Sequence, residues 1–503
     1  MQPISKETAI AIVGAGAMGS GIAQVAATAG HKVFLFDTRE GAAAKAIELL
    51  SPGLEKQVSR GKFTAAQKTD ILSRIHPVDR LAQLADSGLV IEAIVEDLAI
   101  KQELFRQLEA ICADNTILAT NTSSLSVTAI ASVLESPARL VGMHFFNPAQ
   151  VMKLVEVVTG LATGKEFADK VFATAQAWGK SAVFAKSTPG FIVNRVARPF
   201  YAESWRMLEE NVTDAVTIDH AVSKAGGFRM GPFALMDLIG HDINFAVTNS
   251  VYDACYQDPR YRPSLQQKEL VQAGHLGRKT GQGIYNHGAE PPVPSFMETL
   301  PAPSMVQVCG ALENTGKLAA RLAESSIDAR WEDGNGEIRC DHFTLALTDG
   351  RTATQRSVEE GINNLVLFDL ALDYGSAEAL CLAKADQTSE QAFRLAAGFL
   401  ETVGLRPMAV DDSPGLVVMR TVAMLASEAA ETVSHGVADA KSVDTAMTLG
   451  VNYPVGPLAY AEQVGLSRIL TVLQALEGHF GEDRYRPSPF LRRKVLSGGC
   501  FLE

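Results

Sequence analysis

The sequence predicts an α/β protein in which a doubly wound parallel sheet is followed by an all-α domain, a reduced α/β domain and a second copy of the all-α domain. Three observations lead to this fold class. In the first part of the 503-residue chain, short apolar runs alternate with helix-like segments, which is typical of βαβ units. Long helical periodicity without strand signals comes next. Beyond a proline-rich segment, motifs of the helical region occur a second time.

The first domain is expected over residues 1–187. Its first apolar run, Ala9–Val13, leads directly into a glycine turn and a helix of small residues, so the chain begins as strand, turn and helix. Further apolar runs alternate with helical segments such as Lys101–Cys112; they lie at 33–36, 89–94, 116–119 and 140–143. Strands separated by crossover helices assemble into a parallel sheet, and we expect a Rossmann-like one.

From Thr188-Pro189-Gly190 onward the pattern changes to helices. Apolar residues recur at helical spacing within 191–210 and 217–225, so an all-α domain is expected over residues 188–288. Prolines then crowd residues 289–304, at positions 291, 292, 294, 301 and 303. This composition favours a semi-rigid linker.

The second half of the chain is expected to hold a duplicate. Ser413-Pro414-Gly415-Leu416 repeats Thr188-Pro189-Gly190-Phe191, and Gly456-Pro457 repeats Gly231-Pro232. Both repeats lie at the same offset of 225 residues along the chain. Residues 412–503 are therefore predicted to form a second helical copy. That copy has Met419 in place of Asn194 and stops before any equivalent of 277–281.

Residues 305–411 stand where a second nucleotide-binding domain would be. They are much shorter than the first domain and contain neither a G-x-G-x-x-G turn nor a His-Phe-Phe-Asn-Pro segment. We therefore expect a reduced Rossmann-like domain without cofactor, and chemistry confined to the first half.

Composition argues against several classes of protein. Apolar residues make up 47% and charged residues 20% of the chain, and no apolar run reaches the length of about 20 residues that a membrane-spanning helix needs. A net charge of −12 argues against nucleic acid as the main partner. The six cysteines show no C-x-x-C pair and no spacing with histidines that suits a metal. We expect a cytoplasmic protein with reduced thiols, no metal site and no membrane partner.

The glycine turn predicts a dinucleotide. Gly14, Gly16 and Gly19 follow a strand and open a helix. The first permits a tight turn, the second lets the backbone approach a pyrophosphate, and the third lets helix and strand pack closely. Asp37 ends the second strand, where a carboxylate accepts hydrogen bonds from the adenosine ribose and repels a 2′-phosphate. NAD is therefore expected rather than NADP, although Arg39 is close by.

A proton acceptor is predicted at His144. This histidine follows the apolar run 140–143, so it should stand at the carboxyl edge of the sheet, where doubly wound folds bind ligands. Imidazole accepts a hydroxyl proton near neutral pH, and a carboxylate behind it fixes the tautomer and stabilises the imidazolium. Glu156, an acid among β-branched residues, is the candidate for that carboxylate. Taken singly, each would more often be a packed or surface residue.

Together these motifs resemble the NAD-dependent 3-hydroxyacyl-CoA dehydrogenases over residues 8–286. The resemblance rests on the glycine turn, Asp37, Asn121-Thr122-Ser123-Ser124, His144-Phe145-Phe146-Asn147-Pro148, Glu156 and Pro189-Gly190-Phe191-Ile192-Val193-Asn194-Arg195. The duplicated helical domain resembles the long bacterial form of the family, which includes enzymes of 3-hydroxyadipyl-CoA in phenylacetate catabolism and of 3-hydroxybutyryl-CoA. The resemblance implies oxidation of an (S)-3-hydroxyacyl-CoA to the 3-oxoacyl-CoA with NAD, as in β-oxidation.

The resemblance also implies roles for single residues. His144 is then the general base and Glu156 its orienting partner, while Ser123 and Asn194 bond the reacting oxygens of the substrate. Asn147 helps to position the nicotinamide, and the other cofactor contacts carried over are Met18, Glu96, Lys101, Ser123 and Lys279. Plainer alternatives are a helix cap for Ser123, a loop or helix-start hydrogen bond for Asn194, and a solvated surface for the charged residues.

Coenzyme A brings phosphates to an acidic protein, so an acyl-CoA partner requires a local basic rim. Basic residues gather after the second strand, at Lys45, Lys56, Arg60, Lys62 and Lys68. In this family such a segment faces the coenzyme, although a solvated helix face would look the same. The resemblance further implies helical domains that pair, either within one chain or between the subunits of a homo-oligomer.

Two other functions stay open at this point. Dehydrogenases of free 3-hydroxy acids also place helices after a Rossmann domain, but they tend to use a lysine for proton transfer, which disfavours them here. The second is a nucleotide-binding protein without chemistry, because residues 305–411 indicate that part of the chain has lost function. The presence of His144, Glu156, Ser123 and Asn194 speaks against it for the first half.

Overall fold

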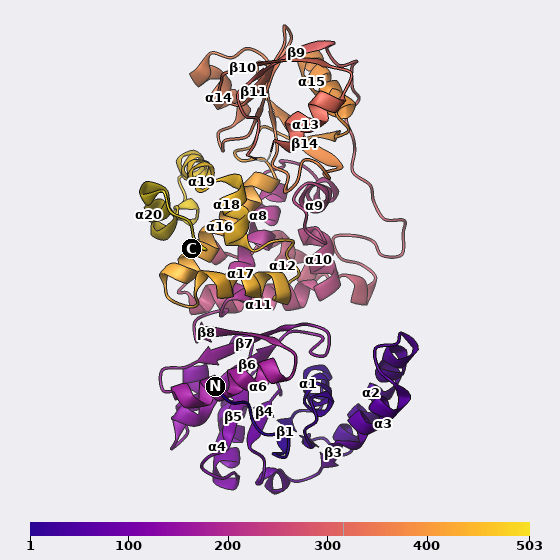
Figure 1. Ribbon diagram of the computed structural model, residues 1–503, viewed down its shortest axis with the longest axis vertical. Helices are drawn as coiled ribbons and strands as arrows, with labels where there is room; N and C mark the ends of the chain where they lie inside the picture. Colours follow the sequence, from indigo (N-terminus) through magenta and orange to yellow (C-terminus); the bar gives the residue numbers. More distant parts are fainter. Residues whose placement is uncertain (315, 503) are drawn as a thin grey trace. The chain divides into compact units, whose positions relative to one another are not determined.

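The computed structural model describes residues 1–314 and 316–502 and divides into two compact units. The first unit comprises Met1–Arg195 together with Gly436–Val451. The second comprises Val196–His435 together with Asn452–Glu503. Figure 1 draws both in the colours of the sequence.

The first unit is built on an eight-stranded sheet with the order β3-β2-β1-β4-β5-β6-β7-β8. Its strands are β1 (Ile10–Val13), β2 (Val33–Phe36), β3 (Ile75–Val78), β4 (Leu89–Glu92), β5 (Ile117–Thr120), β6 (Leu140–Phe145), β7 (Leu154–Thr159) and β8 (Ser181–Lys186). Strands β1 to β6 pair in parallel. Strands β2 and β3 add on one side of β1, and β4 to β6 add on the other side, which confirms the doubly wound fold.

Strand β7 departs from the predicted parallel arrangement, because it runs antiparallel to β6. The loop of residues 146–153 contains no helix, and so short a connection turns the chain back instead of carrying it across the sheet. Strand β8 is again parallel to β7, since α6 (Lys165–Ala177) lies between them in the chain. This reversal sets residues of β6 directly opposite residues of β7.

Helices cover the first sheet. They are α1 (Ala17–Thr28), α2 (Ala42–Ser59), α3 (Ala65–Ser73), α4 (Leu98–Ile111), α5 (Val127–Ala131), α6 and α17 (Ala440–Gly450), with α7 (Val193–Val196) at the boundary of the units. The core packs strand residues such as Ile10 and Ile91 against Ile22 and Ala26 of α1. Most buried side chains of α1 are small, so this helix approaches the strands closely.

Helix α17 comes from the second helical copy but packs on β7 and β8 of the first unit. Its last residue, Gly450, lies where a Cβ would come within 2.7 Å of Leu154 and 3.1 Å of Val193. A backbone amide of β8 also reaches this segment, since Lys186 N donates to the Val437 carbonyl at 2.9 Å. The end of the first sheet is therefore covered by a distant part of the sequence.

The second unit contains a seven-stranded mixed sheet with the order β10-β9-β11-β12-β13-β14-β15. The strands are β9 (Met305–Cys309), β10 (Asp328–Glu332), β11 (Glu337–Arg339), β12 (Thr344–Leu347), β13 (Leu365–Phe368), β14 (Ala379–Lys384) and β15 (Arg406–Ala409); the helices between them are α13 (Lys317–Glu324), α14 (Ala353–Glu360) and α15 (Glu390–Thr402). This confirms a second, reduced α/β element after the first helical region.

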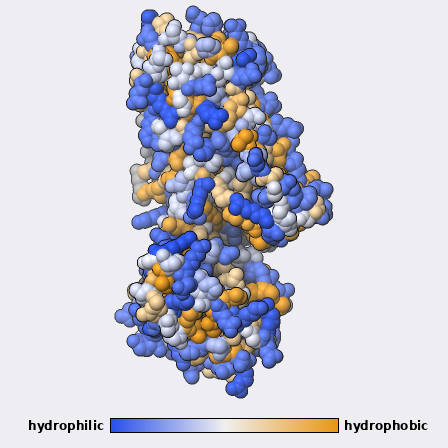
Figure 2. All heavy atoms as spheres, turned by 90° about the vertical axis from the view of Figure 1, so that its right-hand side faces the viewer, coloured by the Kyte–Doolittle hydropathy of each residue, from blue (hydrophilic) through white to orange (hydrophobic). Residues whose placement is uncertain are grey.

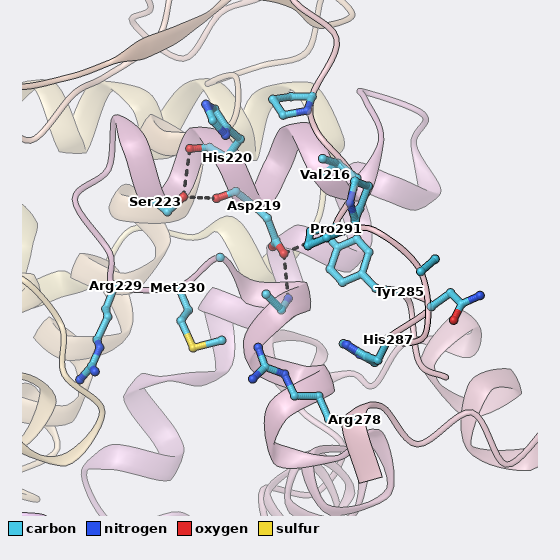
Figure 3. Close-up of a pocket in the computed structure, with 16 residues that line it drawn as sticks. Val216, Asp219, His220, Ser223, Arg229, Met230, Arg278, Tyr285, His287 and Pro291 are labelled. Carbon is cyan, nitrogen blue, oxygen red and sulfur yellow. Dashed lines mark hydrogen bonds between the residues drawn. The ribbon is translucent and has the colours of Figure 1, made fainter. Parts of the chain in front are cut away.

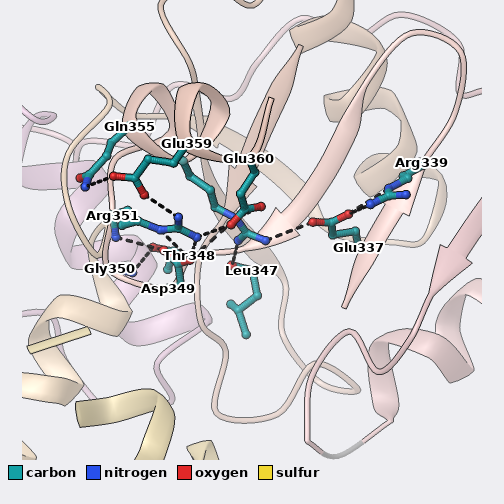
Figure 4. A network of polar contacts seen from close by, with 11 residues as sticks. Glu337, Arg339, Leu347, Thr348, Asp349, Gly350, Arg351, Gln355, Glu359 and Glu360 are labelled. Atoms are coloured by element: carbon teal, nitrogen blue, oxygen red, sulfur yellow. Dashed lines mark hydrogen bonds and ion pairs between the residues drawn. The ribbon is translucent and has the colours of Figure 1, made fainter. Parts of the chain in front are cut away.

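A network of arginines and carboxylates holds α14 against this second sheet (Figure 4). Arg356 on α14 is 7% exposed and donates to Glu337 of β11 at 3.3 Å and to Glu360 at 3.2 Å. Arg351 pairs with Asp349 at 2.5 Å and with Glu359 at 2.8 Å. The network joins β11, the β12–α14 loop and the end of α14, so these charges serve the packing of the reduced domain.

The remaining helices form two copies of one arrangement. The first copy has α8 (Arg198–Glu209), α9 (Ala215–Lys224), α10 (Pro232–Ile239), α11 (His241–Ala254) and α12 (Leu265–Gln272); the second has α16 (Val418–Ser434), α17, α18 (Pro457–Val464), α19 (Leu466–Phe480) and α20 (Pro489–Ser497). Helices α17, α18 and α19 begin at the constant offset from α9, α10 and α11. The same offset relates β14, α15 and β15 to β7, α6 and β8, so the repeat extends further toward the N-terminus than the predicted helical copy.

Within the second unit the two copies pack together through exchanged tyrosine–glutamate pairs. Tyr261 of the first copy donates to Glu428 at 2.7 Å, and Tyr485 of the second donates to Glu203 at 3.1 Å. Arg420 is completely buried between them and bonds Glu203 at 2.9 Å. The reciprocal bonds relate the copies as a two-fold axis relates two subunits.

The described residues include no helix with both the length and the apolar character needed to cross a membrane. Polar and apolar side chains alternate over the face drawn in Figure 2.

We expect Glu203 to give the protein acid-dependent stability. Burial opposes its ionisation, but Arg206 and Arg420 outweigh burial and lower its pKa from 4.5 to about 2. A carboxyl group whose pKa is lower in the folded than in the unfolded protein stabilises the fold at pH values above the unfolded pKa. This contribution is lost as the pH falls from about 5 to about 2. Glu203→Gln should therefore reduce the free energy of unfolding at pH 7 by about 3 kcal/mol and flatten its decline with acid, measured by urea denaturation.

Glu298→Gln provides the control, because Glu298 is 89% exposed in its pair with Arg394. Exposed pairs contribute about 0–1 kcal/mol. Equal acid dependence in wild type and Glu203→Gln would contradict the assignment.

Candidate active site

The reversal at β7 brings His144 and Glu156 together. They are directly opposite partners in the β6–β7 register, so their side chains lie on one face of the sheet. His144 Nδ1 and Glu156 Oε2 are 2.6 Å apart, and the two residues are 5% and 0% exposed. The rings of Phe146 and Phe191 flank the imidazole, with centroids 4.5 and 5.8 Å away. A carboxylate thus holds one ring nitrogen of a nearly enclosed histidine.

The second oxygen of Glu156 anchors the chain that follows β8. Glu156 Oε1 accepts hydrogen bonds from the backbone amides of Ile192 and Val193, each at 3.0 Å. Phe191, just before them, has a φ of 48°, which is unusual for a residue with a side chain. The buried carboxylate therefore has partners at both oxygens and holds a strained turn in place.

That turn presents Asn194 to the end of β5. Asn194 Nδ2 donates to the Ser123 carbonyl at 3.3 Å, so two candidates from distant motifs meet. The helix-cap alternative for Ser123 is wrong, because Ser126 is the N-cap of α5 and accepts the amide of Ala129 at 3.2 Å. His144, Glu156, Ser123 and Asn194 all belong to the first unit.

The side chain of Glu96 binds backbone amides of the turn that contains Ser123. Its Oε1 accepts from Thr122 Oγ1 at 2.6 Å, from Ser123 N at 2.9 Å and from Ser124 N at 3.0 Å. Burial opposes ionisation of Glu96, but the charge of Lys101 and these hydrogen bonds outweigh it and lower its pKa to about 2. Glu96 is therefore a carboxylate that fixes the position of Ser123.

Lys101 is buried, so the solvated-surface alternative for it is wrong. The residue is 1% exposed, and its ammonium lies 2.5 Å from Glu92 and 3.1 Å from Glu96. Glu92, at the end of β4, also accepts Thr120 Oγ1 at 2.7 Å. Glu92 is not among the site residues predicted from the sequence, although an acid that closes an apolar strand signals a buried partner.

The glycine turn has the expected strand–turn–helix context between β1 and α1. Gly14 has a φ of +105°, and a Cβ there would lie 2.4 Å from the Ala93 carbonyl oxygen. A Cβ on Gly19 would lie 1.8 Å from the Gly14 carbonyl oxygen, so this glycine permits the close packing of helix on strand. Nothing lies within 4 Å of a Cβ built on Gly16, which is exposed beside the half-buried Met18. The space at Gly16 is open to a ligand.

Asp37 lies beside this turn and accepts the amide of Ala15 at 2.8 Å. Arg39 folds back onto the same carboxylate, with Nε 3.0 Å from Oδ1. Burial opposes ionisation, but Arg39 and the two backbone amides outweigh it and lower the Asp37 pKa to about 2. Asp37 is therefore negatively charged at neutral pH, and Arg39 is engaged with it.

The other candidates have different surroundings. Asn147 is exposed after β6, next to a cis peptide bond with Pro148. Asn121 Oδ1 accepts the Phe145 amide at 2.8 Å and so ties β5 to the His144 strand. Lys279 belongs to the second unit, where its ammonium pairs with Asp242 at 2.5 Å.

Four of the five basic residues after β2 are exposed: Lys45 and Lys56 on α2, and Arg60 and Lys62 in the connection to α3. Lys68 instead pairs with Glu55 at 2.5 Å. The exposed four are available to an anionic ligand.

The second α/β element has different residues at the positions of His144 and Glu156. At the constant offset, Asp369 replaces His144 and Cys381 replaces Glu156. Asp369 is fully buried, and its oxygens accept the amides of Val417, Val418 and Met419 at 2.7–3.0 Å. Leu416 repeats the positive φ of Phe191, at 51°. A carboxylate still anchors the turn there, but no imidazole accompanies it.

Comparison with known proteins identifies the family. The model of the 3-hydroxyacyl-CoA dehydrogenase NAD-binding domain matches residues 9–188, and that of the C-terminal domain matches residues 190–287 and 415–500. The model of the 3-hydroxybutyryl-CoA dehydrogenase reduced Rossmann-fold domain matches residues 345–414.

One of the similar proteins matches nearly the whole chain, and another matches about half of it. An Escherichia coli (strain K12) 3-hydroxyadipyl-CoA dehydrogenase is 43% identical over 97% of both chains. A Clostridioides difficile 3-hydroxybutyryl-CoA dehydrogenase is 42% identical over 55% of this chain and 99% of its own. The crystal structure of 3-hydroxybutyryl-CoA dehydrogenase from Escherichia coli K12 has a TM-score of 0.90 and 42% identity, covering 98% of this chain and 100% of that one. The chain therefore belongs to the NAD-dependent 3-hydroxyacyl-CoA dehydrogenase family.

Proposed function

We propose that this protein oxidises (S)-3-hydroxyacyl-CoA to 3-oxoacyl-CoA with NAD, and that His144 is the general base. The observation that carries the proposal is the 2.6 Å hydrogen bond between His144 and the buried Glu156 at the carboxyl end of β6. With Nδ1 held by the carboxylate, Nε2 accepts the hydroxyl proton of the substrate. Glu156 then stabilises the imidazolium that forms.

The first unit suits NAD at three points. The N-terminus of α1 presents backbone amides beside the open space at Gly16, an arrangement that accepts a pyrophosphate. The charged Asp37 accepts ribose hydroxyls, and Arg39, engaged with Asp37, is not turned toward a 2′-phosphate. The chemistry that NAD supplies when bound is acceptance of the hydride.

Fixed polar groups hold the reacting centre. We assign Ser123 and Asn194 to the binding of the substrate oxygens. The 3.3 Å hydrogen bond from Asn194 to the Ser123 carbonyl and the hydrogen bond from the Ser123 amide to Glu96 keep both residues in place. Asn147 is assigned to the nicotinamide. Lys101 acts through Glu96 in this proposal, because its own ammonium is enclosed. The remaining proposed cofactor neighbours are Gly14, Met18, Gly19, Glu96 and Lys279.

The proposed substrates are 3-hydroxyadipyl-CoA and 3-hydroxybutyryl-CoA, the molecules named in the relatives. Exposed Lys45, Lys56, Arg60 and Lys62 supply the positive rim for the phosphates of coenzyme A. A cytoplasmic location fits an acyl-CoA substrate and NAD, and it fits the buried cysteines Cys112, Cys309 and Cys381.

Replacing His144 tests the proposal. His144→Gln removes the proton acceptor and leaves the glycine turn intact, so turnover of 3-hydroxybutyryl-CoA should fall by about 10²- to 10⁴-fold. NADH binding, measured by fluorescence, should stay nearly unchanged. His342→Gln is the control, since His342 is exposed in the second unit. Full turnover in His144→Gln would refute the role of His144.

Initial rates with NAD define the substrate. We expect 3-hydroxyadipyl-CoA and 3-hydroxybutyryl-CoA to be oxidised far faster than free 3-hydroxybutyrate, because the exposed basic residues of α2 and the α2–α3 connection have no phosphates to bind in the free acid. Preference for the free acid would favour the other dehydrogenase class. A lack of NADH formation with every thioester would indicate a binding protein without chemistry.

We also propose that the two helical copies of one chain pack on each other in the way that the helical domains of two subunits would otherwise pair. A chain ending at residue 288 would expose the face of α8 that packs on α16. Light scattering should therefore detect self-association of the fragment through this face. A monomeric fragment with full activity would contradict the proposal.

A further inference from the structure

The second unit contains a cavity of about 380 Å³ that the dehydrogenase chemistry does not use (Figure 3). It lies between α9, α10 and the chain that follows Tyr285, and all its lining residues fall within 216–294. Its size is at the lower end of the range for small-molecule sites, about 300–1,000 Å³. The cavity suits a compact ligand rather than a whole coenzyme A thioester.

Its lining is basic, although the protein as a whole carries a net charge of −12. Arg229 and Arg278 line it together with His287 and with His220, whose pKa is lowered by burial, and Asp219 is the one acid among the lining residues. Over residues 1–314 and 316–502, neither Arg229 nor Arg278 has an acidic side chain within ion-pair distance. Two exposed guanidinium groups thus border one cavity with their charges uncompensated.

A buried carboxylate orients His287 at this cavity. His287 Nε2 lies 2.7 Å from Asp237 Oδ2, and Asp237 is only 1% exposed. The other Asp237 oxygen lies 2.7 Å from His241 Nε2 and accepts the amide of Ile284. Burial opposes ionisation of Asp237, but these bonds outweigh it and lower its pKa. Because Nε2 donates to the carboxylate, Nδ1 of His287 carries a lone pair and can accept a hydrogen bond from a ligand.

Asp219 does little to offset the positive charge. Its oxygens accept the amides of Phe233 and Ala234 at 2.8 Å and the hydroxyl of Tyr285 at 2.8 Å. Burial raises its pKa to about 7, so it is partly protonated at neutral pH. An anion entering the cavity meets a hydrogen-bonded acid rather than a free carboxylate.

The second helical copy shows that the fold does not need two of these basic residues. At the constant offset, Asp219 is retained as Asp444, but His220 becomes Thr445 and Arg229 becomes Pro454. Because α18 and α19 form without counterparts of His220 and Arg229, these two basic groups are not a requirement of packing.

We propose that this cavity is a second ligand site, which binds a small organic anion. Arg229 and Arg278 supply the donors for a carboxylate or phosphate group. The rest of the wall is largely apolar and accepts a compact apolar body; it includes Val216, Met230, Ala234, Pro291, Pro292 and Pro294. The ligand class is therefore an anionic group on a short hydrocarbon or ring.

Calorimetric titration of the full chain tests the site. The probes are hexanoate and adipate for carboxylates, and inorganic phosphate and AMP for phosphates, each at millimolar concentration. We expect at least one probe to bind, and its identity separates the two anionic groups. Removing one guanidinium contact in Arg278→Gln or Arg229→Gln should weaken that binding about 10- to 100-fold.

The control is Arg330→Gln, an exposed arginine of β10 outside the cavity. His144→Gln separates this site from the proposed active site, and binding of the probe should survive in both variants. Absence of binding by all four probes would overturn the proposal. So would unchanged affinity in the double variant Arg229→Gln/Arg278→Gln, or loss of binding in His144→Gln.

Discussion

The hydrogen bond between His144 and Glu156 is the interaction on which the site depends. It requires an antiparallel turn after β6, since only that turn sets the two residues opposite each other. It also requires full burial of the carboxylate, which is tolerated because both oxygens have partners: the imidazole on one side and the amides of Ile192 and Val193 on the other. One side chain thus holds the imidazole of His144, the proposed base, and the turn that carries Asn194.

The repeated half of the chain separates these two tasks. Asp369 stands at the position of His144 and still accepts the amides that follow the Pro-Gly turn, while Cys381 stands at the position of Glu156. The anchoring role therefore persists without the imidazole, which indicates that the turn needs a buried carboxylate for structural reasons. Arg420 and the exchanged tyrosine bonds connect the two helical copies. Only the first copy combines an imidazole with the anchoring carboxylate.

Much of this could be predicted from local pattern. The glycine turn, the acid at the end of β2 and the alternation of apolar runs with helices each act over neighbouring residues, so they are legible in sequence. The pairing of His144 with Glu156 was expected from their chemistry and motif. The antiparallel course of β7, the burial of Lys101 between Glu92 and Glu96, and the part of Glu96 in holding Ser123 were not, because each depends on contacts between distant strands.

The sequence by itself determined the fold class, the nucleotide turn and the duplication, since these follow from periodicity and from motifs repeated at a constant offset. Only the tertiary structure decided that α17 covers β7 and β8 of the first unit, and that the repeat reaches back to Asp369. It also decided that residues between 216 and 294 enclose a basic cavity. The physical reason is that register, burial and cavity shape arise from long-range packing, which local sequence pattern does not encode.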